Sequence, residues 1–193
     1  MDHAGKIQKT LYVLPGFGES TQDKPYRQIA RFAKTAGYDV VMYSPKWSRS
    51  TPSDWIAGFR AQLPEKPVGQ AIVFGFSFGA HVAINAAKTF PFDRIIACSL
   101  PPFFKGDIKD IDADTRAFLG KRRMEDLARY PFPARLGTRI TLMNGAEEDA
   151  EDIVKSDRYF KKWTGEKKRI LVDSAEHDLE TGDYLKAIKS ELA

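Results

Sequence analysis

The stretch that most constrains the fold is the segment from residue 70 to 88, which reads QAIVFGFSFGAHVAINAAK. It begins with a short apolar run rich in β-forming residues, 71–74, as is typical of a strand buried on both faces. Gly75 and Gly79 then flank Ser77, and a helical pattern of small residues follows. Because glycine has no Cβ, these two positions allow a sharp turn. The segment therefore predicts a serine hydroxyl presented between the end of a strand and the start of a helix.

Five further apolar runs resemble the first and alternate with helical patterns. The six predicted strands span residues 10–14, 39–43, 71–74, 93–100, 139–144 and 168–172. Strands that alternate with helices predict right-handed crossover connections between parallel strands. We therefore expect an α/β fold, with a doubly wound, mainly parallel six-stranded sheet and helices on both faces.

The strand, the G-x-S-x-G pentapeptide and the helix at 70–88 resemble the nucleophile elbow of the α/β-hydrolase superfamily. The resemblance covers nearly the whole chain after residue 10, and it implies a small serine hydrolase with Ser77 as the nucleophile. It also implies an oxyanion hole, formed by the backbone N–H groups of Phe17, in the loop after the first strand, and of Phe78. The family usually has histidine where Pro15 stands here, but the glycine and Phe17 that follow keep the rest of that loop.

A serine hydroxyl needs a base to accept its proton, and that base needs an acid to orient it. The chain has three histidines. His3 lies in the polar lead-in, and His81 lies one helical turn beyond Ser77, where a structural role is expected. His177 follows the last predicted strand, which is where the resemblance places the base.

The acid is expected in the loop after the fifth predicted strand, where the family places it. Counting three residues without a gap from Gly145 reaches Glu148, whereas aspartate, the commoner residue type, is next in the chain at Asp149. Asp152 is a third and less favoured candidate. We favour Asp149 and keep Glu148 as the alternative, and the chain order of nucleophile, acid and base holds for each of them.

Aromatic residues near the strand ends are candidates for a substrate pocket. Trp47 follows the second predicted strand, and Phe103 and Phe104 follow the fourth. Parallel strands end at one edge of a sheet, so these side chains are placed to line an apolar acyl pocket near Ser77, although packing in the core explains them equally well. Larger members of the family insert a helical cap, but here residues 106–137 leave room for little more than one crossover helix. We therefore expect no large cap and an open site.

Length and composition limit the class of protein. A chain of 193 residues that is 42% hydrophobic is long enough for one domain, which we assign to 1–193, with 1–9 as a flexible lead-in. No window has the apolar length of a membrane span, and the first residues lack the apolar core of a signal peptide. The single cysteine, Cys98, excludes an intramolecular disulfide. These observations together predict a cytoplasmic protein.

The net charge of +4 is modest, and acidic and basic residues are interspersed, so binding to nucleic acid is not expected. The sequence contains no metal-ligand spacing, phosphate-binding glycine loop or dinucleotide fingerprint, so no metal or cofactor is expected.

We therefore predict a serine hydrolase that cleaves a small carboxylic ester or thioester through an acyl-enzyme. Carboxylesterase is favoured. Thioesterase, amidase and lipase stay open as alternatives, because substrate class is set by loops that the motif does not specify. Acyl esters linked to an acidic carrier protein are a further candidate that matches the positive charge. The alternative is a catalytically idle scaffold of the same fold that serves in binding.

Overall fold

The computed structural model describes residues 7–101, 108–133 and 135–193. Its six strands run parallel in one sheet with the order β2-β1-β3-β4-β5-β6, which confirms the predicted α/β architecture. The strands are β1 (Lys9–Leu14), β2 (Asp39–Met42), β3 (Gln70–Phe76), β4 (Arg94–Cys98), β5 (Arg139–Gly145) and β6 (Lys167–Val172). β1 starts one residue inside the predicted lead-in, of which residues 1–6 lie outside the described part of the chain.

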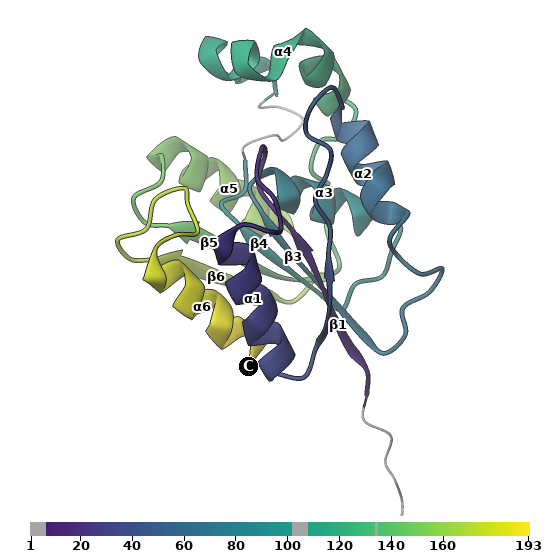
Figure 1. Cartoon of the computed structure of the whole chain (residues 1–193). Helices are drawn as coiled ribbons and strands as arrows, with labels where there is room; N and C mark the ends of the chain where they lie inside the picture. The colour runs from purple at the N-terminus through teal and green to yellow at the C-terminus, as the bar shows by residue number, and fades with distance from the viewer. Residues whose placement is uncertain (1–6, 102–107, 134) are drawn as a thin grey trace, which may run out of the picture.

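Helices cover both faces of the sheet (Figure 1). They are α1 (Lys24–Thr35), α2 (Pro52–Arg60), α3 (Phe78–Ala86), α4 (Ala113–Leu127), α5 (Ala150–Lys162) and α6 (Gly182–Leu192), and a 3₁₀ turn spans Ile108–Asp110. α1 and α6 lie side by side on one face, and α2, α3 and α5 pack on the other.

The core consists of two apolar layers, because successive side chains of a strand point to opposite faces. In β3, Ile72, Phe74 and Phe76 pack against α1 and α6, whereas Ala71 and Val73 pack against α2 and α3. β3 is thus buried on both sides, as its continuous apolar sequence predicts. Because all six strands are parallel, their carboxyl ends meet at one edge of the sheet, at the top of Figure 1.

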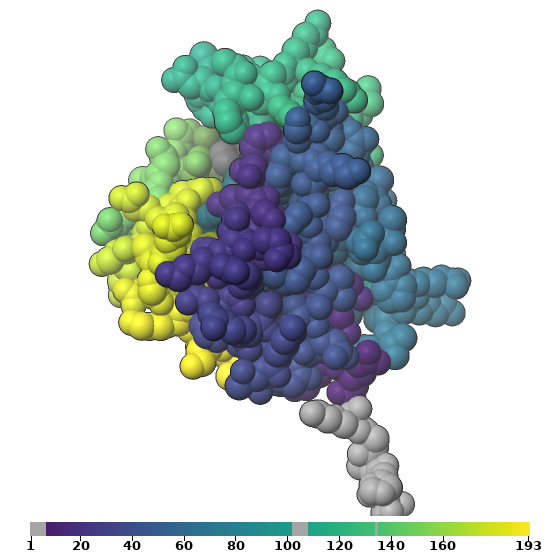
Figure 2. Space-filling view, in the orientation of Figure 1, coloured from purple at the N-terminus to yellow at the C-terminus, as the bar shows by residue number. Residues whose placement is uncertain are grey.

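Helix α4 differs from the predicted crossover helix. It lies above the carboxyl edge of the sheet, where it forms the top layer of the molecule, and it packs on α2 rather than on a sheet face (Figures 1 and 2). This charged helix has too few apolar residues to cover a sheet. Its buried residues include Asp126, whose carboxylate accepts hydrogen bonds from the amide (2.6 Å) and the hydroxyl (2.7 Å) of Ser53 in α2. A left-handed glycine, Gly120 (φ 74°), bends the helix in the middle.

Within the part of the chain that the structure describes, every helix is too short or too polar to cross a membrane.

Candidate active site

Ser77 stands at the junction of β3 and α3 with a strained backbone (φ 51°, ψ −120°). A residue with a Cβ rarely adopts this positive φ, and such strain is characteristic of functional turns. A Cβ on Gly75 would lie 2.5 Å from the carbonyl oxygen of Gly79, and a Cβ on Gly79 would lie 2.5 Å from the carbonyl oxygens of Leu14 and Pro15. Both glycines are therefore required by close backbone packing, and together they place Ser77 at the carboxyl edge of a central strand.

The structure brings Ser77, His177 and Glu148 together from three separate loops. His177 Nε2 lies 3.0 Å from Ser77 Oγ, within hydrogen-bonding distance. On the other side of the ring, His177 Nδ1 lies 3.7 Å from Glu148 Oε2, slightly longer than a hydrogen bond. The His177 side chain is half exposed and packs against the ring of Phe76, whereas the Glu148 side chain is buried.

Four hydrogen-bond donors hold Glu148, in addition to its contact with His177. Its Oε1 accepts from Ser99 Oγ (2.7 Å), from the Gly145 amide (2.7 Å) and, at 3.4 Å, from Tyr184 Oη, while its Oε2 accepts from Asn144 Nδ2 (2.7 Å). Burial acts to raise the pKa of Glu148, but the adjacent His177 ring and the hydrogen bonds from Ser99, Asn144 and the Gly145 amide together hold the pKa below its ordinary value. The carboxyl is therefore ionised at neutral pH and can only accept hydrogen bonds.

Asp149, the acid favoured from the sequence, occupies a different position. It is the N-cap residue of α5, and its Oδ1 accepts hydrogen bonds from the amides of Glu151 (2.8 Å) and Asp152 (3.4 Å). Asp152 itself is in the first turn of α5. The structure thus brings the alternative acid, Glu148, to His177 in place of Asp149, because the carboxylate of Asp149 is used to satisfy the free amides at the start of a helix.

The loop after β1 lies directly against the start of α3, since Gly79 packs on the carbonyl oxygens of Leu14 and Pro15. This arrangement places the two predicted oxyanion residues next to each other, and the rings of Phe17 and Phe78 are 5.5 Å apart. Hydrogen bonds hold this loop in place: the Gly16 amide donates to Glu19 Oε2 (2.9 Å) and lies 3.0 Å from Tyr26 Oη of α1.

Of the predicted pocket residues, Trp47 lies beside this loop. Its Nε1 donates to the Glu19 carbonyl (2.8 Å), and its ring packs on Phe17 (5.3 Å between centroids) and on Trp55 (4.9 Å). Trp47 is therefore a buried anchor of the Phe17 loop. Phe103 and Phe104 lie outside the described residues.

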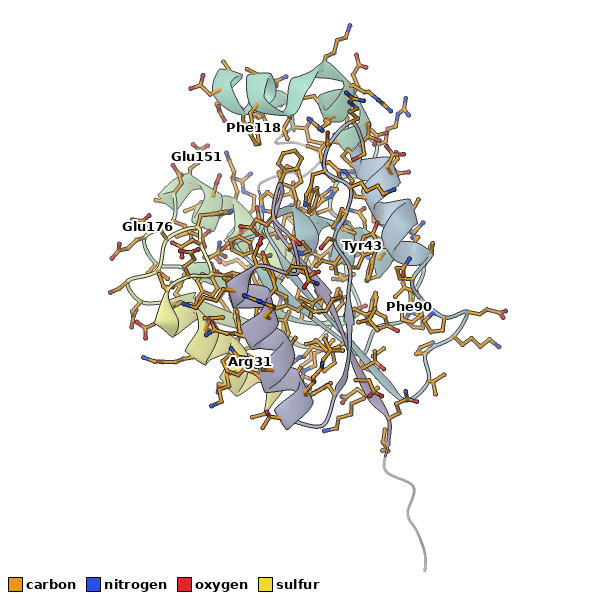
Figure 3. The ribbon with its side chains drawn as sticks, in the orientation of Figure 1. Arg31, Tyr43, Phe90, Phe118, Glu151 and Glu176 are labelled. Carbon is orange, nitrogen blue, oxygen red and sulfur yellow. The ribbon has the colours of Figure 1, made fainter. Side chains whose placement is uncertain are left out.

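An aromatic residue that the sequence did not single out for the pocket extends from α4 toward the same loop. Phe118 points from α4 down to the carboxyl edge of the sheet (Figure 3), and its ring lies 5.3 Å from that of Phe17 although its side chain stays mostly exposed. Arg123, also on α4, stacks over the Phe17 ring at 5.2 Å and donates to the Trp47 carbonyl (2.9 Å). Through these contacts α4 is attached to the loop that carries Phe17.

The other titratable residues discussed from the sequence are not part of the Ser77–His177–Glu148 arrangement. His81 is fully buried, its Nε2 is 2.7 Å from the Tyr130 carbonyl, and burial lowers its pKa to about 4. Cys98 is fully buried at the end of β4, and burial raises the pKa of its thiol well above the ordinary value. His3 lies outside the described residues.

No protein-family model and no curated protein matches the sequence. Solved structures do match the fold over nearly the whole chain. The α/β hydrolase domain-containing protein 10 from mouse is 12% identical, with a TM-score of 0.77 over 97% of this chain and 89% of the other. Est1E from Butyrivibrio proteoclasticus is 12% identical (TM-score 0.74, 98% and 88% covered), and the esterase domain of a Rhodothermus marinus protein is 18% identical (TM-score 0.73, 96% and 85% covered).

Proposed function

We propose that this chain, which has the α/β-hydrolase fold, is a serine hydrolase that cleaves carboxylic esters or thioesters through an acyl-enzyme. The observation that carries the proposal is the alignment of Ser77 Oγ, the His177 ring and Glu148 Oε2 at the strand–helix turn. In this proposal Ser77 is the nucleophile, His177 the base and Glu148 the acid that orients the base.

The buried carboxylate decides which nitrogen of His177 carries the proton. An ionised carboxylate can only accept a hydrogen bond, so the neutral imidazole is protonated at Nδ1, which faces Glu148. Nε2 then carries the lone pair and accepts the hydrogen bond from the Ser77 hydroxyl at 3.0 Å. This is the tautomer in which the imidazole can accept the serine proton.

The proposed reaction has two halves. Ser77 Oγ attacks the carbonyl carbon while His177 Nε2 accepts its proton, and the negative charge that develops on the carbonyl oxygen is stabilised by the N–H groups of Phe17 and Phe78. The tetrahedral intermediate collapses as the imidazolium protonates the departing alcohol or thiol, which leaves the acyl group on Ser77. In the second half His177 deprotonates a water that attacks the acyl-enzyme, and the carboxylic acid leaves as Ser77 regains its proton from His177.

The preference for an ester rests on two structures of the same fold. One is described as an esterase domain and one as a monoacylglycerol lipase, and they are 18% and 16% identical to this chain. Within esters, we favour a carboxylesterase that acts on small acyl esters, with thioesters and carrier-linked acyl esters as the next candidates. Phe118 and Phe17 are positioned to contact an apolar acyl or alcohol group.

The experiment that tests the proposal is labelling with a fluorophosphonate probe, which reacts only with an activated serine. Wild type is expected to be labelled on Ser77, and Ser77→Ala is expected to remain unlabelled. His177→Ala is expected to lower hydrolysis of p-nitrophenyl acetate on the order of 10⁶-fold, as for other residues of a catalytic unit. Ser190→Ala, on the exposed side of α6, serves as the control and is expected to behave as wild type. Absence of labelling in folded wild type would favour the idle binding scaffold instead.

A further inference from the structure

We infer that Ser99 and Tyr184 are positioning residues, which fix Glu148 in the orientation that serves His177. This inference rests on the proposed function, because it assigns Glu148 the role of the triad acid. Ser99 follows β4, Tyr184 lies on α6 and Glu148 follows β5, so three elements meet at one carboxylate oxygen.

The two hydroxyls form a chain that ends on Glu148. Ser99 Oγ lies 2.7 Å from Glu148 Oε1 and 2.8 Å from Tyr184 Oη, while Tyr184 Oη is 3.4 Å from the same carboxylate oxygen. The ionised carboxylate cannot donate, so the Ser99 proton points to Glu148. Ser99 Oγ is then left as the acceptor for the Tyr184 hydroxyl, whose proton strengthens the first hydrogen bond.

Burial and backbone strain indicate that these hydroxyls have a specific role. Ser99 and Tyr184 are both 0% exposed, and a buried hydroxyl is costly unless it is hydrogen-bonded. Ser99 also adopts a left-handed backbone (φ 50°), a conformation that residues with a side chain rarely adopt. Core packing alone would be served by alanine and phenylalanine at these positions. The feature that requires the hydroxyls is the carboxylate at the end of the chain they form.

The donors are divided between the two carboxylate oxygens. Oε1 accepts directly from Ser99 and the Gly145 amide, with Tyr184 Oη 3.4 Å away behind Ser99, whereas Oε2 accepts from Asn144 Nδ2 and faces His177 Nδ1. One oxygen is therefore anchored, and the other is directed at the base. Removal of one anchor leaves the other donors in place, so the carboxylate still faces His177 but is held less firmly and its charge is less dispersed. The Glu148–His177 pair then binds a proton more tightly.

Among the described residues, the titratable groups that face the Glu148–His177 pair come from three elements. They are Cys98 of β4, Tyr184 of α6 and Asp152 of α5. Burial raises the pKa of Cys98 and of Tyr184 well above their ordinary values, so both stay neutral throughout the assay range. Burial, together with the charge of Asp149, raises the pKa of Asp152, which interacts with His177. All pH profiles are therefore measured in an Asp152→Asn background.

The test compares Tyr184→Phe and Ser99→Ala with two matched controls. Tyr12→Phe removes a hydroxyl from a buried tyrosine that packs among Phe59, Phe90 and Phe92, and Ser156→Ala removes a buried hydroxyl that has no hydrogen-bond partner among the described residues. Two readouts are used: the rate of fluorophosphonate labelling against pH, and the titration of the His177 ring by NMR. With three histidines in the chain, the His177 signal is assigned by its loss in His177→Gln.

Both test variants are expected to move the acid limb of the labelling profile and the His177 titration upward by about one pH unit. Their labelling rates at neutral pH should fall about tenfold, and the controls should match the parent protein. Thermal unfolding shows which variants are folded, and either test variant alone can decide the result. Profiles of a folded test variant that coincide with those of the controls would overturn the inference.

The inference and the proposed function fail in different ways. If Ser77→Ala were labelled or hydrolysed esters as wild type does, the proposed function would be lost. The NMR titration needs no activity, so it would still report whether Ser99 and Tyr184 act on the Glu148–His177 pair. If instead Ser77→Ala were inactive and the titration of His177 were unchanged in both test variants, the inference alone would be lost.

Discussion

Replacement of Gly75 by alanine tests how tightly the turn at Ser77 is closed. The new Cβ would lie 2.5 Å from the Gly79 carbonyl oxygen and 2.6 Å from the Ala80 amide nitrogen. An ordinary contact begins at 3.4 Å, so the start of α3 must move by about 0.9 Å. Both neighbours are backbone atoms, and overpacking of this kind costs about 1–3 kcal/mol. For a chain of this length, that corresponds to a fall in Tm of about 2–12 °C.

The effect on reactivity is expected to exceed the effect on stability. A displacement near 1 Å in a reacting group lowers rates about 100-fold, so Gly75→Ala should label with a fluorophosphonate about 100 times more slowly while it remains folded at room temperature. The matched control is Gly182→Ala at the start of α6, where a Cβ meets nothing within 4 Å and where a gain of about 0.4–1 kcal/mol is expected. The assays are thermal unfolding by circular dichroism and the labelling rate. Wild-type values of both in Gly75→Ala would refute the reasoning.

Two further predictions concern single side chains. Glu148→Gln should lower ester hydrolysis about 10⁴-fold, as loss of a triad acid does, whereas Asp149→Asn should keep near wild-type activity because asparagine also caps helices; the reverse order of activities would contradict the geometry. The unfolded chain protonates His81 below about pH 6.5, but the folded chain does so only near pH 4, because burial lowers the pKa of His81. The free energy of unfolding should therefore fall by about 3 kcal/mol between pH 6.5 and 4, and urea denaturation of His81→Gln should lack this loss.

The architecture and the turn at Ser77 could be predicted because their signals are local. Each strand is a short apolar run, and the alternation with helices leaves a parallel sheet as the expected arrangement. The requirement for glycine at position 75 is also local, since a Cβ there collides with the backbone of Gly79 and Ala80, whereas Gly79 is required by the distant backbone of Leu14 and Pro15. The position of α4 above the sheet edge was not predicted, because a charged helix with few apolar residues does not reveal which surface it packs on.

The choice between neighbouring acids depends on contacts between loops. The end of β5 packs against the loop that carries His177: the Glu147 amide donates to the Ala175 carbonyl (3.0 Å), and a Cβ on Gly145 would overlap that carbonyl. This turn directs Glu148 back toward the Gly145 amide and leaves Asp149 as the helix cap. One local signal could have pointed to Glu148 as the acid: Asp149 directly precedes a helical pattern, and aspartate is favoured as an N-cap at such a position.

The residues that hold Glu148 could not be assigned from the sequence. Ser99 and Asn144 are polar residues at the carboxyl ends of apolar strands. The sequence shows this position, but it does not show which group each residue binds. Tyr184 has the spacing of a core residue on α6, and its hydroxyl reaches the acid only because α6 packs behind β5 and β6. Such a network is a property of tertiary packing, so no single segment encodes it.

Helix α4 is structurally separate from the elements that carry the proposed catalytic groups. The groups that we assign to the reaction come from β1, β3, β4, β5, α6 and the loops around them, and none of them comes from the described residues 108–133. α4 adds Phe118 and Arg123, which touch the Phe17 loop from above. Under the proposed function, this segment could therefore be exchanged for another of different shape, which would change the acyl groups that are accepted and keep the catalytic groups, provided that a stacking partner for Phe17 is kept.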